Sequence, residues 1–242
     1  MFIGVSGLIG AGKSTLTKQL AEEMTTRGAM RVAERQTFLG HTPPVLGPTW
    51  KPVYEPVETN PYLEDFYADI SRWTFNMQMF LLAKRFQQHQ EVIWDPCHRG
   101  NELCSEPGGV IQDRTIYEDT IFARMHRDDG LMDDRDWETY ITHFHVMQGF
   151  LRYPDVILYL RVEPEVAAAR IQERGRNAEK EIPIEYLQRL HEGYEEFVEE
   201  MSRYTVVVTF DWTEYKPVGE VADAIEEATH REQKFLRSLR RI

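Results

Sequence analysis

The stretch FIGVSGLIGAGKST, residues 2–15, decides the fold class of this chain. Its first part, Phe2–Ser6, is short and mostly apolar, as expected of a strand buried between helix layers. Gly7–Ser14 then matches the spacing G-x-x-x-x-G-K-[ST], and a helical pattern follows over Ser14–Arg27. Glycines in this order let backbone N–H groups turn inward around phosphate oxygens at a helix N-terminus. The stretch therefore predicts a nucleotide phosphate-binding loop.

The side chains of this loop predict how the phosphates are held. Lys13 would bridge the outer phosphates of the nucleotide, and the hydroxyl of Ser14 would hold Mg²⁺. A GTP-binding switch would need a guanine-reading Asn-Lys-x-Asp string, and the sequence has none. We expect the residues that bind the ATP phosphates to be Gly7, Gly10, Ala11, Gly12, Lys13, Ser14 and Thr15.

Short apolar runs alternate with longer amphipathic segments along the rest of the chain. This alternation predicts an α/β fold, a five-stranded parallel sheet with right-handed crossovers that is flanked by helices. The expected strands are Phe2–Ser6, Pro52–Tyr54, Val110–Gln112, Val156–Arg161 and Val206–Phe210. The expected helices are Ser14–Arg27, Pro61–Trp94 with a break near Arg72, Glu118–Asp128, Trp137–Leu151, Glu165–Arg174, Pro183–Arg203 and a basic terminal helix over Thr229–Ile242.

Two segments interrupt the alternation and are interpreted as insertions. Gly28–Lys51 is rich in Gly and Pro, which favours a loop or surface excursion. Asp95–Gly109 is a second turn-rich segment. Because 242 residues are close to the length of one typical domain, we expect a single domain with these two additions.

The charge balance excludes some classes of partner. The chain carries 28 Lys+Arg against 40 Asp+Glu, a formal net charge of −12, so a nucleic-acid polymer is not expected as a ligand. No apolar run approaches the roughly 20 residues of a membrane helix. Only two cysteines occur, and the first residues do not resemble a signal peptide. These features favour a cytoplasmic protein without a membrane partner.

Charged side chains follow two of the expected strands. Glu55 comes after the second strand, and Asp113 and Arg114 come at the end of the third. The carboxyl ends of strands in an open parallel sheet line the ligand crevice. Glu55 could there take a proton from an attacking hydroxyl or hold a metal-bound water, while Asp113 faces Mg²⁺ and Arg114 the phosphate oxygens. The alternatives are a turn acid and a structural ion pair.

Three arginines follow in the spacing Arg-x-x-x-Arg-Gly-Arg. Arg170 and Arg174 share a helix face because they are four residues apart, and Gly175 lets the chain turn so that Arg176 also reaches inward. Three guanidinium groups could together clamp a transferring phosphoryl group. An exposed basic helix end is the alternative interpretation.

Several segments, taken in their order along the chain, resemble the deoxynucleoside kinase family. Their sequences are most similar to its bacterial deoxyadenosine/deoxyguanosine kinase branch. The match runs from Met1 to about Phe210, apart from the two insertions. The resemblance implies that residues 170–182 form a lid over the donor phosphates. The segments are GLIGAGKST (7–15), EPVETNPYLE (55–64), YADISRWTFNMQ (67–78), DRTIYED (113–119) and RIQERGRNAEKEIPIEYLQRLHEGYE (170–195).

The resemblance also implies an acceptor pocket. Gln78 matches the family's base-reading glutamine, and Arg85 with Asp119 matches the pair that accompanies it in kinases accepting purines or cytosine. By themselves, Gln78 and Arg85 could also be polar positions on a helix surface. One residue fewer than is usual in the family precedes Phe122 after Asp119. The further contacts that the resemblance implies are Tyr67 and Glu179 at the sugar 3′-hydroxyl, Phe122 stacked on the base, and Trp212 near the donor adenine.

We therefore predict an enzyme of nucleotide salvage that transfers the γ-phosphoryl group of ATP to the 5′-hydroxyl of a deoxynucleoside. Purine deoxynucleosides are favoured, with deoxycytidine as a further substrate. Glu55 is the expected general base, Arg114 holds the 5′ end, and Lys13 and the lid arginines neutralise developing charge. The expected Mg²⁺ site comprises Ser14, Glu55 and Asp113.

Two other functions compete with this prediction. A nucleoside monophosphate kinase of the thymidylate type shares the loop, the lid and the fold. A kinase-like subunit kept for binding without catalysis is the other, although Lys13 and Glu55 are both present. The resemblance implies a homodimer as well, with feedback inhibition by a deoxynucleoside triphosphate.

Overall fold

Five parallel strands, hydrogen-bonded in the order β2-β3-β1-β4-β5, form the centre of the structure. The computed structural model describes residues 1–39, 48–55, 60–94, 108–175 and 182–239. Every strand pairing in this sheet is parallel. The predicted sheet is confirmed, and each strand begins and ends within two residues of the expected bounds. The strands are β1 (Phe2–Gly7), β2 (Trp50–Val53), β3 (Gly109–Asp113), β4 (Val156–Arg161) and β5 (Val206–Asp211).

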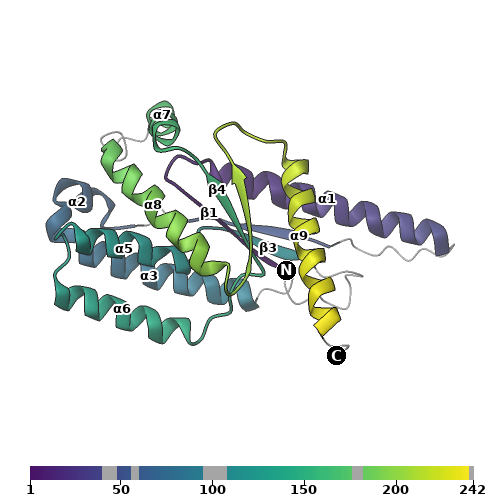
Figure 1. The fold of residues 1–242 in the computed structure, drawn as a ribbon, viewed down its shortest axis with the longest axis horizontal. Coiled ribbons are helices and arrows are strands. Elements are labelled where there is room, and N and C mark those ends of the chain that lie inside the picture. The colour runs from purple at the N-terminus through teal and green to yellow at the C-terminus, as the bar shows by residue number, and fades with distance from the viewer. Residues whose placement is uncertain (40–47, 56–59, 95–107, 176–181, 240–242) are drawn as a thin grey trace.

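Helices cover both faces of this sheet (Figure 1). On one side, α1 (Lys13–Leu39) packs against α9 (Val218–Leu239). On the other side, α3 (Ile70–Trp94), α5 (Asp119–Asp128) and α8 (Ile184–Met201) pack in turn, and α6 (Asp134–Gln148) lies against α3 and α5. The remaining described helices are α2 (Leu63–Ala68), the 3₁₀ turn η1 (Ile116–Glu118) and α7 (Pro164–Arg174). None of the helices in the described ranges is long and apolar enough to cross a membrane.

The burial of the central strand β1 explains how the phosphate-binding loop is held in the fold. All six residues of β1 are buried, and Ile3 and Val5 are completely inaccessible to solvent. Burying a branched aliphatic side chain stabilises the fold by about 1.5–3 kcal/mol, so a strand that is covered on both faces is held firmly. The loop that follows Gly7 is therefore attached to a fully buried central strand.

The first insertion was predicted wrongly in part. Gly28 does not end a helix: α1 continues to Leu39, so the first dozen residues of the segment 28–51 are helical. A Cβ at Gly28 would overlap the ring of Pro48, which lies directly against the helix. The glycine therefore serves close packing rather than helix termination. Residues 40–47, a third of the first predicted insertion, and residues 95–107, most of the second, lie outside the described residues.

Two helix boundaries also differ from the sequence prediction. The break in the segment after Pro61 falls at Asp69 rather than near Arg72, because the carboxylate of Asp69 accepts a hydrogen bond from the backbone N–H of Arg72 (3.1 Å) and so caps α3. The terminal helix α9 begins at Val218, well before the predicted Thr229. Its early turns bury Val221, Ala222 and Ile225 against the sheet and α1.

Two buried histidines make the stability of this fold depend on pH. His89 on α3 is completely inaccessible, its ring meets Phe2 edge to face at 5.0 Å, and its Nε2 lies 2.8 Å from the carbonyl oxygen of Arg152. Burial lowers the pKa of His89 to about 4, and it lowers the pKa of His126 on α5 to about 4 as well. The folded protein thus keeps both rings neutral where the unfolded chain protonates them.

We predict that acid destabilises the protein well above the pKa of its carboxylates. Between about pH 6.5 and 4 the unfolded chain binds more protons, so the free energy of unfolding falls as the pH drops, by about 2 kcal/mol per histidine at pH 5. His89→Gln keeps a hydrogen-bond donor for the carbonyl oxygen of Arg152, and it should remove the part of this loss that His89 causes. The free energy of unfolding is measured by urea unfolding at pH 7.5 and at pH 5. His143→Gln, at an exposed position, is the control. An equal pH dependence in His89→Gln and wild type would contradict this account.

Candidate active site

A cavity of about 850 Å³ opens where the strands β1, β2 and β3 end at their carboxyl sides. It extends from the phosphate-binding loop to α3, α5 and the start of α8. Most of the residues predicted to bind or react with substrate line it, so the structure brings them together at one cavity. These predicted lining residues are Gly10, Gly12, Lys13, Ser14, Thr15, Glu55, Gln78, Arg85, Asp113, Arg114, Phe122, Arg170 and Arg174.

The backbone of the phosphate-binding loop requires its glycines. Gly7, Gly10 and Gly12 have positive φ angles of 147°, 85° and 86°, which side chains with a Cβ rarely adopt. A Cβ at Gly10 would also lie 2.7 Å from the carbonyl oxygen of Ala167 on α7. Ala11 is completely buried beneath the loop. The loop is therefore shaped by backbone geometry, and its curve encloses the N-terminus of α1.

Lys13 lies folded over its own loop. Its Nζ donates hydrogen bonds to the carbonyl oxygens of Gly7 (3.0 Å) and Leu8 (2.8 Å). Burial, helped by the charge of Arg114, lowers the pKa of Lys13 to about 8. An anionic phosphate beside this ammonium group would offset the burial, so the site favours a bound anion over an empty loop.

Ser14 and Asp113 meet at the side of the loop that faces β3. The Ser14 hydroxyl donates a hydrogen bond to Asp113 Oδ2, while the other carboxylate oxygen of Asp113 is buried without a protein partner. No group of three or more His, Cys, Asp or Glu that could hold a metal occurs among the described residues. Hydroxyl and carboxylate oxygens nevertheless suit Mg²⁺, which usually takes one or two protein ligands together with water and substrate phosphate. The donor set fits that ion.

Glu55 lies between two buried arginines. Its Oε1 accepts a hydrogen bond from Arg85 Nη2, and its Oε2 lies 3.3 Å from Arg114 Nε. Burial alone would raise the pKa of Glu55, but the charges of Arg85, Arg114 and Lys13 outweigh it and lower the pKa to about 2. Glu55 is therefore a carboxylate at any physiological pH and can accept a proton there.

Arg85 continues this arrangement toward α5. Its second nitrogen forms an ion pair with Asp119, so Asp119 and Arg85 meet although one residue fewer than usual separates Asp119 from Phe122. Gln78 lies two turns before Arg85 on α3, is almost fully buried, and lines the cavity. The ring of Phe122 lies 5.0 Å from the Arg114 guanidinium. Arg85, Gln78 and Phe122 therefore line the cavity, while Asp119 holds Arg85 from a completely buried position.

The first two lid arginines lie on α7, but Arg170 has a partner that the sequence did not reveal. Its Nη2 donates to the carbonyl oxygens of Trp212 and Thr213, both at 2.9 Å, and its guanidinium lies 4.3 Å from the ring centre of Tyr215. Arg170 thus ties α7 to the loop between β5 and α9. Arg174 lines the main cavity one turn further along the helix.

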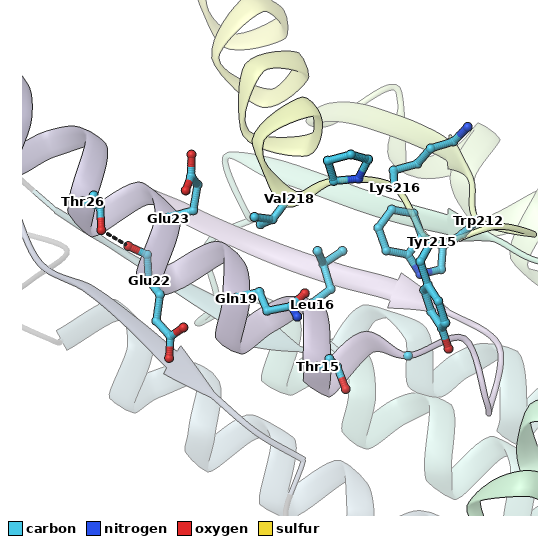
Figure 2. Close-up of a pocket in the computed structure, with 12 residues that line it drawn as sticks. Thr15, Leu16, Gln19, Glu22, Glu23, Thr26, Trp212, Tyr215, Lys216 and Val218 are labelled. Atoms are coloured by element: carbon cyan, nitrogen blue, oxygen red, sulfur yellow. Dashed lines mark hydrogen bonds between the residues drawn. The ribbon is translucent and has the colours of Figure 1, made fainter.

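A second cavity, of about 660 Å³, joins the loop at its outer side. Figure 2 shows one face of α1 along its floor and the loop after β5 above it. Trp212 borders this cavity, yet its ring is only 3% exposed and packs edge to face against Phe210. Tyr215 is 64% exposed and borders both cavities. Sequence reasoning missed Tyr215, and the aromatic spacing after β5 was the signal that could have found it.

Some predicted site residues cannot be placed. Arg176 and Glu179 lie outside the described residues, as do the other residues of the predicted lid between 176 and 181. Tyr67 belongs to α2, but its side chain is outside the described set. The structure adds three side chains that the sequence did not single out: His126 lines the cavity, while Glu118 and Tyr194 contact Arg114 beside it.

A parallel sheet with a glycine-rich loop of the phosphate-binding type, and a half-buried carboxylate between two arginines in the adjoining cavity, are typical of a nucleotide-dependent phosphotransferase. The sequence profile described as deoxynucleoside kinase matches residues 3–235 of this chain. The chain therefore belongs to the deoxynucleoside kinase family, and it is an enzyme that phosphorylates deoxynucleosides.

Individual relatives agree with this assignment. The chain is 37% identical to a deoxyadenosine kinase of Dictyostelium discoideum over 98% of this chain and 82% of that one. It is 36% identical to a deoxyadenosine/deoxycytidine kinase of Bacillus subtilis over 81% of this chain and 76% of the relative. Among solved structures, a deoxyadenosine kinase from M. mycoides with dCMP and dCDP bound covers 98% of this chain and 100% of its own, with 29% identity and a TM-score of 0.64.

Proposed function

We propose that the enzyme transfers the γ-phosphoryl group of ATP to the 5′-hydroxyl of a deoxynucleoside, in salvage of DNA precursors. The observation that carries this is the ionised Glu55 carboxylate, which lies between Arg85 and Arg114 in the cavity that also contains the phosphate-binding loop. A carboxylate there can receive the hydroxyl proton, and the cations beside it can receive the charge of the transferring group.

The mechanism follows from these positions. The 5′-oxygen forms a bond to the γ-phosphorus as the bond to the β,γ-bridging oxygen breaks, the hydroxyl proton passes to Glu55, and ADP leaves. Arg114 orients the 5′ end, and Lys13 with Arg174 stabilises charge on the phosphoryl oxygens. Ser14 and Asp113, with Glu55 through water, would hold Mg²⁺, which when bound neutralises the donor phosphates.

The base of the acceptor would be recognised by hydrogen bonds to the polar side chains that line the cavity. Gln78 offers both a donor and an acceptor, and Arg85 held by Asp119 offers a fixed pair of N–H groups. We propose that this set prefers adenine and guanine, and also admits cytosine, because the relatives are deoxyadenosine, deoxyguanosine and deoxyadenosine/deoxycytidine kinases. Phe122 would stack on the base, and Tyr67 and Glu179 would hold the sugar 3′-hydroxyl.

The second cavity supports a place for the donor base. It begins at Gly12 and Thr15 of the phosphate-binding loop and continues under Trp212 and Tyr215 (Figure 2). We infer that the ATP adenine lies there, with the exposed ring of Tyr215 closer to it than the buried ring of Trp212. We propose that the enzyme acts in the cytoplasm, the compartment expected from the sequence.

We also propose that two copies of the chain form a homodimer through α3 and α6. Trp94, Val146 and Phe150 are 62%, 61% and 73% exposed. Gln90 links two of them, because it accepts a hydrogen bond from the Trp94 indole N–H and donates one to the backbone oxygen of Phe150. An exposed apolar cluster of this kind favours contact with another protein surface. Feedback inhibition is proposed because M. mycoides deoxyadenosine kinase has been solved with dCTP and with dATP bound.

A substrate panel tests the proposed function. With ATP and Mg²⁺, we expect ADP release with deoxyadenosine, deoxyguanosine and deoxycytidine, at least tenfold less with deoxythymidine, and none above background with deoxynucleoside monophosphates. Added dATP or dCTP should lower the rate. Turnover of monophosphates alone would indicate a monophosphate kinase, and nucleotide binding without any transfer would indicate a non-catalytic subunit. Deoxythymidine as the best substrate would contradict the role given to Arg85 and Asp119.

The role of Glu55 is tested by Glu55→Gln. Loss of the proton acceptor should lower kcat about 10²–10⁴-fold. The nucleoside dissociation constant, measured by calorimetry, should change only a few-fold, because the amide keeps the shape of the carboxylate and its oxygen can still accept a hydrogen bond from one of the two arginines. Glu91→Gln, the same change at an exposed position on α3, is the control. Nearly unchanged turnover in Glu55→Gln would show that another group is the base.

The proposed dimer is tested by placing a charge in the apolar cluster. Val146→Glu should give a monomer by light scattering, because a carboxylate cannot be buried there without a partner. Met30→Glu, which introduces the same charge at a similarly exposed position on α1, should leave the assembly unchanged. A wild-type chain that is already monomeric, or a Val146→Glu variant that still dimerises, would overturn this interface.

A further inference from the structure

Glu118 is a completely buried carboxylate beside the reaction centre, in a position that the proposed mechanism does not use. One oxygen accepts hydrogen bonds from the Ser6 hydroxyl (2.8 Å) and the Thr115 backbone N–H (3.0 Å). The other accepts one from the Tyr194 hydroxyl (2.8 Å) and lies 3.4 Å from Arg114 Nη1. A buried carboxylate is costly unless its lone pairs are satisfied, so four donors on one side chain mark an organised structural feature.

Tyr194 on α8 connects this carboxylate to Arg114. Its hydroxyl donates to Glu118 and accepts from Arg114 Nη1, so one oxygen atom touches both charged groups. Its ring is fully buried between Tyr159, stacked at 5.9 Å, and Phe122, edge to face at 6.5 Å. Burial raises the pKa of Tyr194, which keeps the hydroxyl protonated. Because the ring cannot turn away, its hydroxyl is a fixed point.

Arg114 depends on such fixed points because its own backbone is unusual. It is the one non-glycine residue in the described ranges with a positive φ, 64°, a conformation that costs about 1 kcal/mol or more. Four neighbours then surround its side chain on three sides: Glu55 at Nε, Glu118 and Tyr194 at Nη1, and the Phe122 ring on one face. A guanidinium group held on three sides presents its remaining N–H groups in one direction only.

We propose that Glu118 and Tyr194 are positioning residues for phosphoryl transfer, which hold Arg114 in the orientation that orders the 5′-hydroxyl against Glu55. The inference rests on the proposed function only in taking Glu55 and Arg114 as the reaction centre. The anchoring itself rests on contacts: Ser6, next to Gly7 at the end of β1, is linked through Glu118 to Arg114. A displacement of about 1 Å at a reacting group can cost on the order of 100-fold in rate.

The consecutive acids Glu118 and Asp119 balance the charges of the two arginines that contact Glu55. Asp119 pairs with Arg85, and Glu118 pairs with Arg114, so each arginine that contacts Glu55 has its own second carboxylate. Each guanidinium group is thereby shared between an inner acid, Glu55, and an outer acid. The carboxylate of Glu55 remains accessible from the cavity.

Tyr194→Phe is the most conservative test, because it removes one oxygen atom and keeps the ring in the core. We expect kcat for the deoxynucleoside to fall about tenfold or more, with the KM for ATP unchanged within twofold. Tyr159→Phe is the matched control: its ring stacks on Tyr194, but its hydroxyl bonds to Glu195 (3.0 Å) away from Arg114. We expect Tyr159→Phe to retain wild-type kcat. Equal rates in the two variants would overturn the proposal.

A double-mutant cycle identifies the residue through which Tyr194 acts. In an Arg114→Lys background, Tyr194→Phe should cause little further loss of kcat. The planar guanidinium group that the Tyr194 hydroxyl contacts is already absent in that background. An undiminished tenfold loss in that background would show that Tyr194 does not act through Arg114. Glu118→Gln should be non-additive with Arg114→Lys in the same way.

The same variants give a measurement that does not need turnover. If Tyr194 and Arg114 are coupled, the shifts of the urea unfolding midpoint in Tyr194→Phe and Arg114→Lys should not add in the double variant, whereas those of Tyr159→Phe and Arg114→Lys should. Additive shifts for both pairs would refute the anchoring contact. If the wild-type enzyme were inactive on every deoxynucleoside, the proposed function would be refuted but the contact between Tyr194 and Arg114 would not. The unfolding measurements would still show whether these two residues are coupled.

Discussion

The Glu55 carboxylate lies between the guanidinium groups of Arg85 and Arg114, and the architecture of the site depends on this buried ion cluster. Two cations this close repel each other, and each loses hydration, so they are stable only where acids flank them on both sides. Glu118 and Asp119 supply the outer charges. The result is a series of alternating charge, Asp119, Arg85, Glu55, Arg114 and Glu118, whose two ends are consecutive buried residues of the chain.

This arrangement reconciles a strongly acidic chain with an anionic substrate. The net charge of −12 describes the whole molecule, whereas the phosphates would meet Lys13, Arg114 and Arg174 at one end of a cavity. Glu55, with its pKa near 2, is a weak base. Phosphoryl transfer passes through a loose transition state, which depends more on positioning and charge than on early proton removal. An ionised, firmly held carboxylate suits that requirement.

The sequence predicted the parts of the site that local rules specify. The phosphate-binding loop follows from glycine spacing between a strand and a helix, and the placement of Glu55, Asp113 and Arg114 follows from strand ends meeting at one edge of a parallel sheet. It did not predict the helical continuation beyond Gly28, because a glycine that permits close packing and one that ends a helix look the same in a single sequence. Tyr215 was missed for a related reason: its exposure and its contact with Arg170 depend on a partner on α7.

The sequence by itself therefore determined the fold class, the phosphate-binding loop and the family, since these rest on spacing along the chain and on hydrophobic periodicity. Only the tertiary structure decided which charges share a cluster. Ser6, Glu118 and Tyr194 come from β1, η1 and α8 and are separated by more than 70 residues at each step, yet hydrogen bonds join them. The physical reason is burial: the need to satisfy each polar atom inside the core selects partners by their distance in space, which no local pattern in the sequence records.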